Sequence, residues 1–160
     1  MPGTGGVNNL RPEHPRKDDL LSTQALDLTP QDSLVAIMIA ISVSDETIRT
    51  AELVTIERIV NHLPVFAEYD IERLRRVSDF IFDLFTREDG LDVLFQRIRE
   101  ALPERLFETA YALACDVAAA DGRLREAELR LLEEMRYELD IDRLHAAAIE
   151  RGARARHLTV

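Results

Sequence analysis

The sequence lacks the features that mark secreted, membrane-spanning or disulfide-bonded proteins. Its single cysteine, Cys115, excludes an internal disulfide, so a reducing cytoplasm is the expected compartment. The longest mostly apolar run, Leu34 to Val43, has ten residues, whereas a spanning helix needs about 20. The amino terminus also lacks a basic stretch followed by an apolar one, so we expect no secretion signal.

Basic residues are scarce relative to acidic ones. The 160 residues include 20 Lys and Arg against 30 Asp and Glu, which gives a net charge of −10. Because this charge repels phosphate backbones, it argues against a nucleic-acid binder and favours a cation or a basic protein partner. The length and the 46% hydrophobic content suit one domain that buries its own core.

Familiar catalytic motifs are absent as well. The sequence has no Gly-rich phosphate loop, no Gly-x-Ser-x-Gly and no His-Glu-x-x-His. We therefore predict a protein without enzymatic activity. The alternative is a metal-assisted hydrolase that uses carboxylates as ligands and base, but the sequence offers it no separate nucleophile or oxyanion donor.

Glycine and proline are concentrated in residues 1–28, which show no sustained apolar period and predict a disordered tail. The ordered part is expected to begin at Thr29 to Asp32. There a capping threonine, a proline at the first helical position and an aspartate that reaches back form a typical helix start. We predict one helical domain over residues 29–150 and a basic tail over residues 151–160.

Apolar residues recur with helical spacing through this domain, and no segment alternates as a strand would. The pattern predicts an all-α fold of about seven helices. They are expected at about 29–44, at 50–62, from 70, at 90–101, from 103, at 126–138 and from 140. Taken alone, the run Leu34–Val43 is also compatible with a buried strand, because a short continuous apolar run shows neither helical nor strand periodicity.

An internal repeat organises the chain. The turn at 45–52 recurs 76 positions later at 121–128. The second copy of the Leu34–Val43 run is alanine-rich and clearly helical, which indicates that the first copy is a helix too. A third pair of helices aligns with an offset of 70, because the first copy carries six extra residues around 63–69. The sequence thus predicts two three-helix repeats joined by a bridging helix at 90–101.

The paired turns of the form Asp-Gly-x-apolar-x-x-x-Glu, each after a helix of small residues in an acidic domain, resemble the tellurite-resistance TerB family and its relatives. These include the amino-terminal domain of a membrane-anchored DnaJ-type co-chaperone. The resemblance covers residues 30–150 and implies a bacterial all-helical fold, acidic residues that bind metal ions, and a tellurite and stress response alongside membrane partners. The matching residues are Asp45, Glu52, Asp121, Gly122 and Glu128. Glu46 replaces the usual glycine, so we expect a distorted first turn with a weaker site.

The second turn also matches the last eight positions of an EF-hand loop, including the glycine and the closing glutamate. The match fails upstream, because Ala119 and Val117 stand where oxygen ligands are needed. A metal site must therefore pool carboxylates from both turns or from Asp116, about one helical turn before Asp121. Such ligands suit Ca²⁺, Mg²⁺ or Mn²⁺ better than Zn²⁺. Without metal, crowded carboxylates should raise at least one carboxyl pKa.

A metal-free interpretation explains the same residues. Asp-Gly ends a helix well, because glycine tolerates left-handed geometry. Glu52 and Glu128 lie in the first turn of a helix, where a carboxylate interacts favourably with free amides and the helix dipole. Arg49 and Arg125, three residues before those glutamates, could neutralise them as i, i+3 pairs.

Two functions are therefore expected. The first is a cytoplasmic TerB-like domain that binds a divalent cation through its acidic turns and passes that state to a protein partner. The second is a metal-free interaction module whose acidic surface docks a basic or membrane-attached partner. In either case, contact with the inner membrane would be peripheral and made through partners. We also expect Leu124 to point inward, and Arg73, Arg75 and Arg76 to form a solvated face balanced by neighbouring acids.

Overall fold

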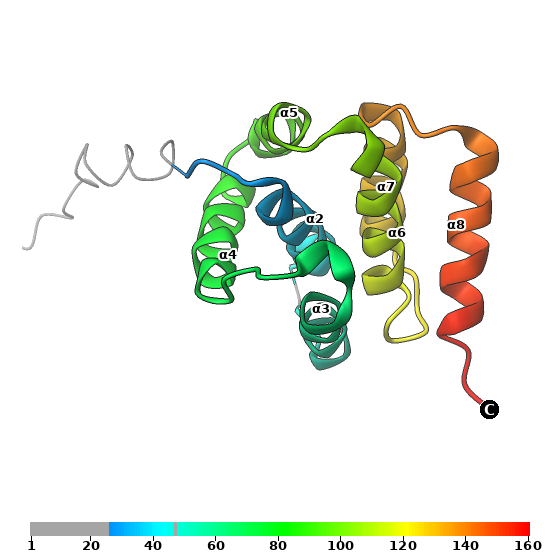
Figure 1. Ribbon diagram of the computed structural model, residues 1–160. Helices are drawn as coiled ribbons and strands as arrows, with labels where there is room; N and C mark the ends of the chain where they lie inside the picture. Colours follow the sequence, from blue (N-terminus) through cyan, green and yellow to red (C-terminus); the bar gives the residue numbers. More distant parts are fainter. Residues whose placement is uncertain (1–25, 47) are drawn as a thin grey trace, which may run out of the picture.

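The computed structural model describes residues 26–46 and 48–160, and every regular element in them is helical (Figure 1). This confirms the predicted all-α fold of about seven helices. The α-helices are α2 Pro30–Val43, α3 Thr50–His62, α4 Glu72–Phe85, α5 Gly90–Ala101, α6 Phe107–Ala118, α7 Glu126–Glu138 and α8 Arg143–Arg156. Two short 3-10 helices, η1 Pro64–Phe66 and η2 Glu104–Leu106, connect them. No described helix is long and apolar enough to cross a bilayer.

Helix α2 is the centre of the core, and Figure 1 shows it surrounded by other helices. The hydroxyl of Thr29 accepts from the backbone N–H of Asp32, whose side chain accepts from the Thr29 N–H, so the predicted capping box is present. Every residue from Asp32 to Val43 is buried. The apolar run is therefore a helix, and it is apolar all round because helices cover all its sides.

The helices form two related units, each built around its first helix. The first unit consists of α2, α3 and α4, and the second of α6, α7 and α8. In each unit the first helix packs against the other two, and between units α2 packs against α6 and α7 while α3 packs against α6. Helices α3 and α7 have bounds that differ by 76 at both ends. This reciprocal packing is what two copies of one unit, paired face to face, would show.

Three predicted boundaries need correction. Leu28 is buried and Leu26 packs against the core, so the ordered part begins before residue 29. The rest of the predicted tail, residues 1–25, lies outside the described residues. Helix α8 continues to Arg156, since Ala153 is buried and Arg156 bonds to Asp116, so only the last residues of 151–160 are non-helical. Helix α6 begins at Phe107, after η2, and not at residue 103.

The extra residues of the first unit complete a buried polar network at the start of α2. Asp32 is fully buried and accepts hydrogen bonds from the Arg73 guanidinium and from the Tyr69 hydroxyl at 2.9 Å. Burial raises the pKa of Asp32, but hydrogen bonds from Arg73, Thr29 and Tyr69 outweigh it, and the net pKa is lowered. Of the three arginines predicted to form a solvated face, Arg75 and Arg76 are exposed, whereas Arg73 is half-buried and pairs with Asp32.

Candidate functional site

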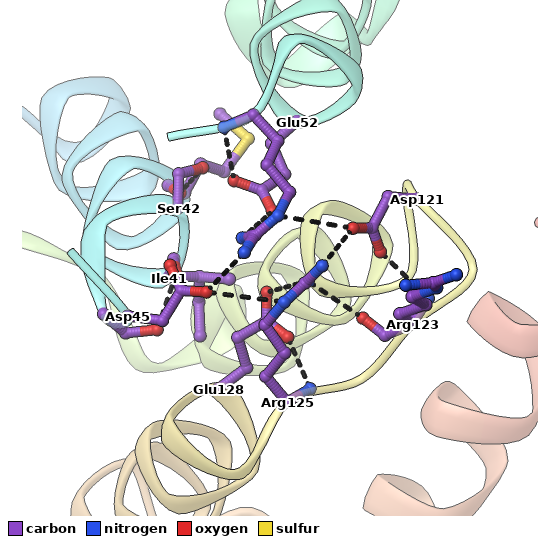
Figure 2. Close-up of polar contacts among 11 residues, drawn as sticks. Ile41, Ser42, Asp45, Glu52, Asp121, Arg123, Arg125 and Glu128 are labelled. Atoms are coloured by element: carbon purple, nitrogen blue, oxygen red, sulfur yellow. Dashed lines mark hydrogen bonds and ion pairs between the residues drawn. The ribbon is translucent and has the colours of Figure 1, made fainter. Parts of the chain in front are cut away.

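The two acidic turns meet in one place, because they follow the paired helices α2 and α6. Figure 2 shows Asp45, Asp121 and Arg125 turned toward one another. Nη2 of Arg49 lies 2.8 Å from Oδ2 of Asp45, and Nη2 of Arg125 lies 2.7 Å from Oδ2 of Asp121. Each arginine also reaches the aspartate of the other unit, since Nε of Arg49 is 3.7 Å from Asp121 and Nε of Arg125 is 3.4 Å from Asp45.

Two glutamates complete this acid–arginine cluster, which comprises Asp45, Arg49, Glu52, Asp121, Arg125 and Glu128. Both glutamate side chains are 1% exposed, and both lie at the third position of a helix. Glu52 accepts from the backbone N–H of Arg49 at 3.4 Å, and Glu128 accepts from that of Arg125 at 2.7 Å. Their second oxygens lie 3.5 and 3.7 Å from the guanidinium groups of the same arginines.

Arginine suits this geometry because its planar guanidinium has five donors directed at two or more acceptors at once. Arg49 and Arg125 each bridge two aspartates and one glutamate, so each links the two units as well as its own turn. The i, i+3 pairs expected in the metal-free interpretation are therefore present. The pairs between units add a connection that the linear spacing did not predict.

The pKa shifts follow from this pairing and from burial. Burial raises the pKa of Glu52 and of Glu128 above the usual range, and the hydrogen bonds from Arg49 and Arg125 only partly oppose it. For Asp121, burial acts in the same direction, but hydrogen bonds from the Arg125 side chain and the Arg123 backbone lower its pKa overall. The pKa of both buried glutamates is thus raised, but burial is the main cause, and the repulsion between carboxylates that we expected contributes little.

One oxygen of the cluster is without a hydrogen bond. Among buried side-chain nitrogens and oxygens of the described residues, Oε1 of Glu128 alone lacks a hydrogen-bond partner. It still lies 3.7 Å from Nη1 of Arg125, so its charge is balanced by an ion pair without being fully hydrogen-bonded. An incompletely satisfied buried carboxylate is costly, which is consistent with the raised pKa of Glu128.

At the position of the missing glycine, the first turn has the same left-handed backbone as the second. Glu46 has a φ of 62°, close to the φ of 74° at Gly122. A residue with a side chain in this left-handed conformation costs about 1–2 kcal/mol. At this position the backbone therefore keeps the conformation of the glycine turn, and Glu46 is strained.

Two other predicted positions differ from the structure. Leu124 is 45% exposed, so the prediction that it points inward is wrong. Asp116 faces α8, where its Oδ1 lies 2.6 Å from Nη2 of Arg156 and 3.5 Å from Nε2 of His157. Asp116 is thus committed to the contact between α6 and α8 and not to the pooled carboxylates.

The residues as they stand do not fit a divalent cation. Within residues 26–46 and 48–160, no group of three or more His, Cys, Asp or Glu side chains is placed to hold a metal ion. The guanidinium groups of Arg49 and Arg125 bond to the carboxylates that would be the ligands. A cation would therefore have to displace both arginines from the aspartates.

Comparison with known proteins found no matching family model, no matching curated protein and no matching solved structure. The resemblance to the TerB family, and what it implies for function, therefore stays a prediction.

Sequence reasoning missed two groups of residues. The network of Asp32, Tyr69 and Arg73 was not predicted, because the role of Asp32 as a capping residue was enough to explain its presence. Its signal was the six-residue insertion, which places Tyr69 and Arg73 after an extra 3-10 turn. The other group lines a groove beside α8, and its signal was the run of small residues Ala146–Ala148 in that helix.

Proposed function

We propose that the chain is a non-enzymatic, TerB-like interaction module in which the acid–arginine cluster joins the two helical units. One observation carries the proposal: Arg49 and Arg125 each pair with the aspartates of both units. All four carboxylates thereby have a cationic partner within the chain itself. The cluster then serves to fix the relative position of the units, and the outer surface is left to bind a protein partner.

The net charge of −10 favours a partner with a basic surface, and the contact should weaken as salt is added. A tellurite or stress response in the cytoplasm, with partners at the inner membrane, is the setting that the TerB resemblance implies. It is part of the proposal on that ground alone.

Cation binding is the second candidate function, and one observation favours it. Oε1 of Glu128 is buried without a hydrogen bond, and burial raises the pKa of both Glu52 and Glu128. A cation that entered the cluster would relieve this cost, provided that Arg49 and Arg125 moved away. The ions to consider are Ca²⁺, Mg²⁺ and Mn²⁺ before Zn²⁺.

Melting temperature and titration calorimetry with these four ions at millimolar levels decide between the two functions. The proteins to compare are the wild type, the variant Asp121→Asn/Glu128→Gln, and Asp116→Asn as a control acid outside the cluster. We expect no binding heat and an unchanged melting temperature for all three, because the carboxylates are already neutralised. A rise of several degrees in the wild type and in Asp116→Asn, lost in the double variant, would establish the cation function instead.

A further inference from the structure

A groove runs along the second unit between α7 and α8. Helix α8 lies at the outer edge of the molecule in Figure 1. Its volume is about 710 Å³. Tyr111 and Cys115 of α6 contribute to its floor. Leu124, Leu129 and Leu158 line it while remaining 45%, 48% and 75% exposed. It is therefore an apolar surface of the second unit that no other part of the described chain covers.

The groove is open because α8 buries fewer and smaller side chains against the core than its counterpart α4. Helix α4 buries large side chains against the core, namely Val77, Phe80, Ile81 and Leu84. Helix α8 buries two alanines, Ala146 and Ala153. Small side chains on α8 leave space between it and α7 that large side chains would fill.

The rim of this groove is basic, in contrast to the acidic chain as a whole. Its charged lining residues are Arg123, Arg136, Arg143, Arg154, Glu133 and Glu150. None of the four arginines has an ion-pair partner among the described residues, unlike the arginines of the cluster. Glu150 is partly engaged, because it accepts a hydrogen bond from the Tyr111 hydroxyl at 2.6 Å. Unpaired guanidinium groups beside exposed leucines point to a ligand that is both apolar and acidic.

We propose that the α7–α8 groove binds a second kind of partner, distinct from the basic surface that the net charge favours. This partner is an amphipathic α-helix whose apolar stripe is flanked by aspartate and glutamate. Helix α8 has 14 residues, so the groove is about 20 Å long and accommodates a helix of about four turns. Side chains of the stripe would pack on Leu124 and Leu129, and the flanking carboxylates would pair with Arg143 and Arg154. The walls are helices with no strand edge, so a helix is the complementary element.

Fluorescence anisotropy with two labelled peptides tests this proposal. One peptide of about 16 residues has leucines at helical spacing flanked by glutamates, and the other has lysine in place of each glutamate. Because the whole chain is acidic, non-specific attraction would favour the lysine peptide. We expect the glutamate peptide to bind at least about tenfold more tightly, with a preference that shrinks as salt increases.

Paired variants locate the binding surface. Leu129→Ala and Arg154→Glu should each weaken binding of the glutamate peptide about tenfold, because they remove an apolar contact and reverse a rim charge. Leu53→Ala is the control for the first, since Leu53 is the repeat counterpart of Leu129 and is 52% exposed. Arg151→Glu is the control for the second, because Arg151 is exposed on α8 but does not line the groove. Each control should leave the affinity within about twofold.

Several results would overturn the proposal. These are failure of both peptides to bind, tighter binding of the lysine peptide, or equal effects of groove variants and controls. Binding to vesicles of anionic lipid without binding to the peptide would assign the groove to a membrane surface. A dimer of the wild type that Leu129→Ala disrupts would assign it to a second copy of the chain. All these variants leave the cluster unchanged, so peptide binding can fail while the cation titration still supports the proposed function.

Discussion

Each unit pairs an acid near the start of its first helix with a basic residue of its last helix, but at different depths. Asp32 at the start of α2 pairs with Arg73 of α4, and Glu108, 76 positions after Asp32, pairs with His145 of α8. The Asp32 side chain is 0% exposed, whereas Glu108 and His145 are 54% and 62% exposed. The extra residues before α4 make the difference, because Tyr69 and Val65 of that segment cover the start of α2.

The contribution of each of these contacts to the free energy of unfolding depends on its burial more than on the presence of a pair. An exposed pair is largely hydrated before and after folding, so its removal changes little. A buried carboxylate that loses its cation keeps its desolvation cost without compensation. The same reasoning separates the buried glutamates of the cluster from its more accessible aspartates.

The largest effect is expected when Arg73 is replaced. Arg73→Ala leaves Asp32 buried without its cation and should lower the free energy of unfolding by about 3 kcal/mol. The matched change, His145→Ala, removes an exposed partner and should leave that free energy unchanged within error. Urea denaturation of both variants measures the difference. Equal losses in the two variants would contradict the conclusion that the buried pair contributes more to stability than the exposed pair.

An intermediate effect is expected at the two turns. Gly122→Ala should lower the free energy of unfolding by about 1 kcal/mol, because the φ of 74° strains a residue with a Cβ. No atom lies within 4 Å of the added Cβ, so strain is the whole effect. Glu46→Gly should raise the free energy of unfolding by about 0.5–1 kcal/mol. This change removes the same strain from the folded state but also makes the unfolded chain more flexible, which offsets part of the gain. Thermal melts of the two variants should therefore move in opposite directions, and shifts of the same sign would show that the turns differ in shape.

The smallest effect is a pH dependence that differs in sign between two acids of one turn. The folded-state pKa of Glu128 is raised above its ordinary 4.5, so its contribution to stability is fully present below that value and is lost as pH rises through the folded pKa. The folded-state pKa of Asp121 is lowered below its ordinary 3.8, so its contribution is present above that value and is lost as pH falls.

Unfolding free energies at a series of pH values, for the wild type, Glu128→Gln and Asp121→Asn, measure both slopes. The advantage of the wild type over Glu128→Gln should shrink as pH rises above 4.5. Its advantage over Asp121→Asn should shrink as pH falls below 3.8. Parallel slopes would mean that the two carboxyls share one environment, contrary to their different exposure.

Local patterns were enough to predict most helices, while contacts between distant residues were not. The Thr29 cap predicted where α2 begins, and the internal repeat predicted that α2 is a helix. The offset of 76 predicted that the turns before α3 and α7 are related. The pairing of Arg125 with Asp45 depends on how α2 and α6 cross, which spacing along the chain does not specify. The burial of Asp32 likewise depends on a segment more than 30 residues away. Side-chain size on α8, and not its apolar period, decided that the second unit has a groove.

Cys115 gives the second unit a property that the first does not share. It lies on the floor beneath α8, it is 4% exposed, and burial raises the pKa of its thiol to about 12. The folded protein therefore presents almost no thiolate to a maleimide at neutral pH. Because the chain has no other sulfhydryl, alkylation occurs at one position, and we expect it to be fastest in molecules whose last helix has moved away from α6. The alkylation rate of Cys115 therefore measures, without an added label, how often that helix detaches.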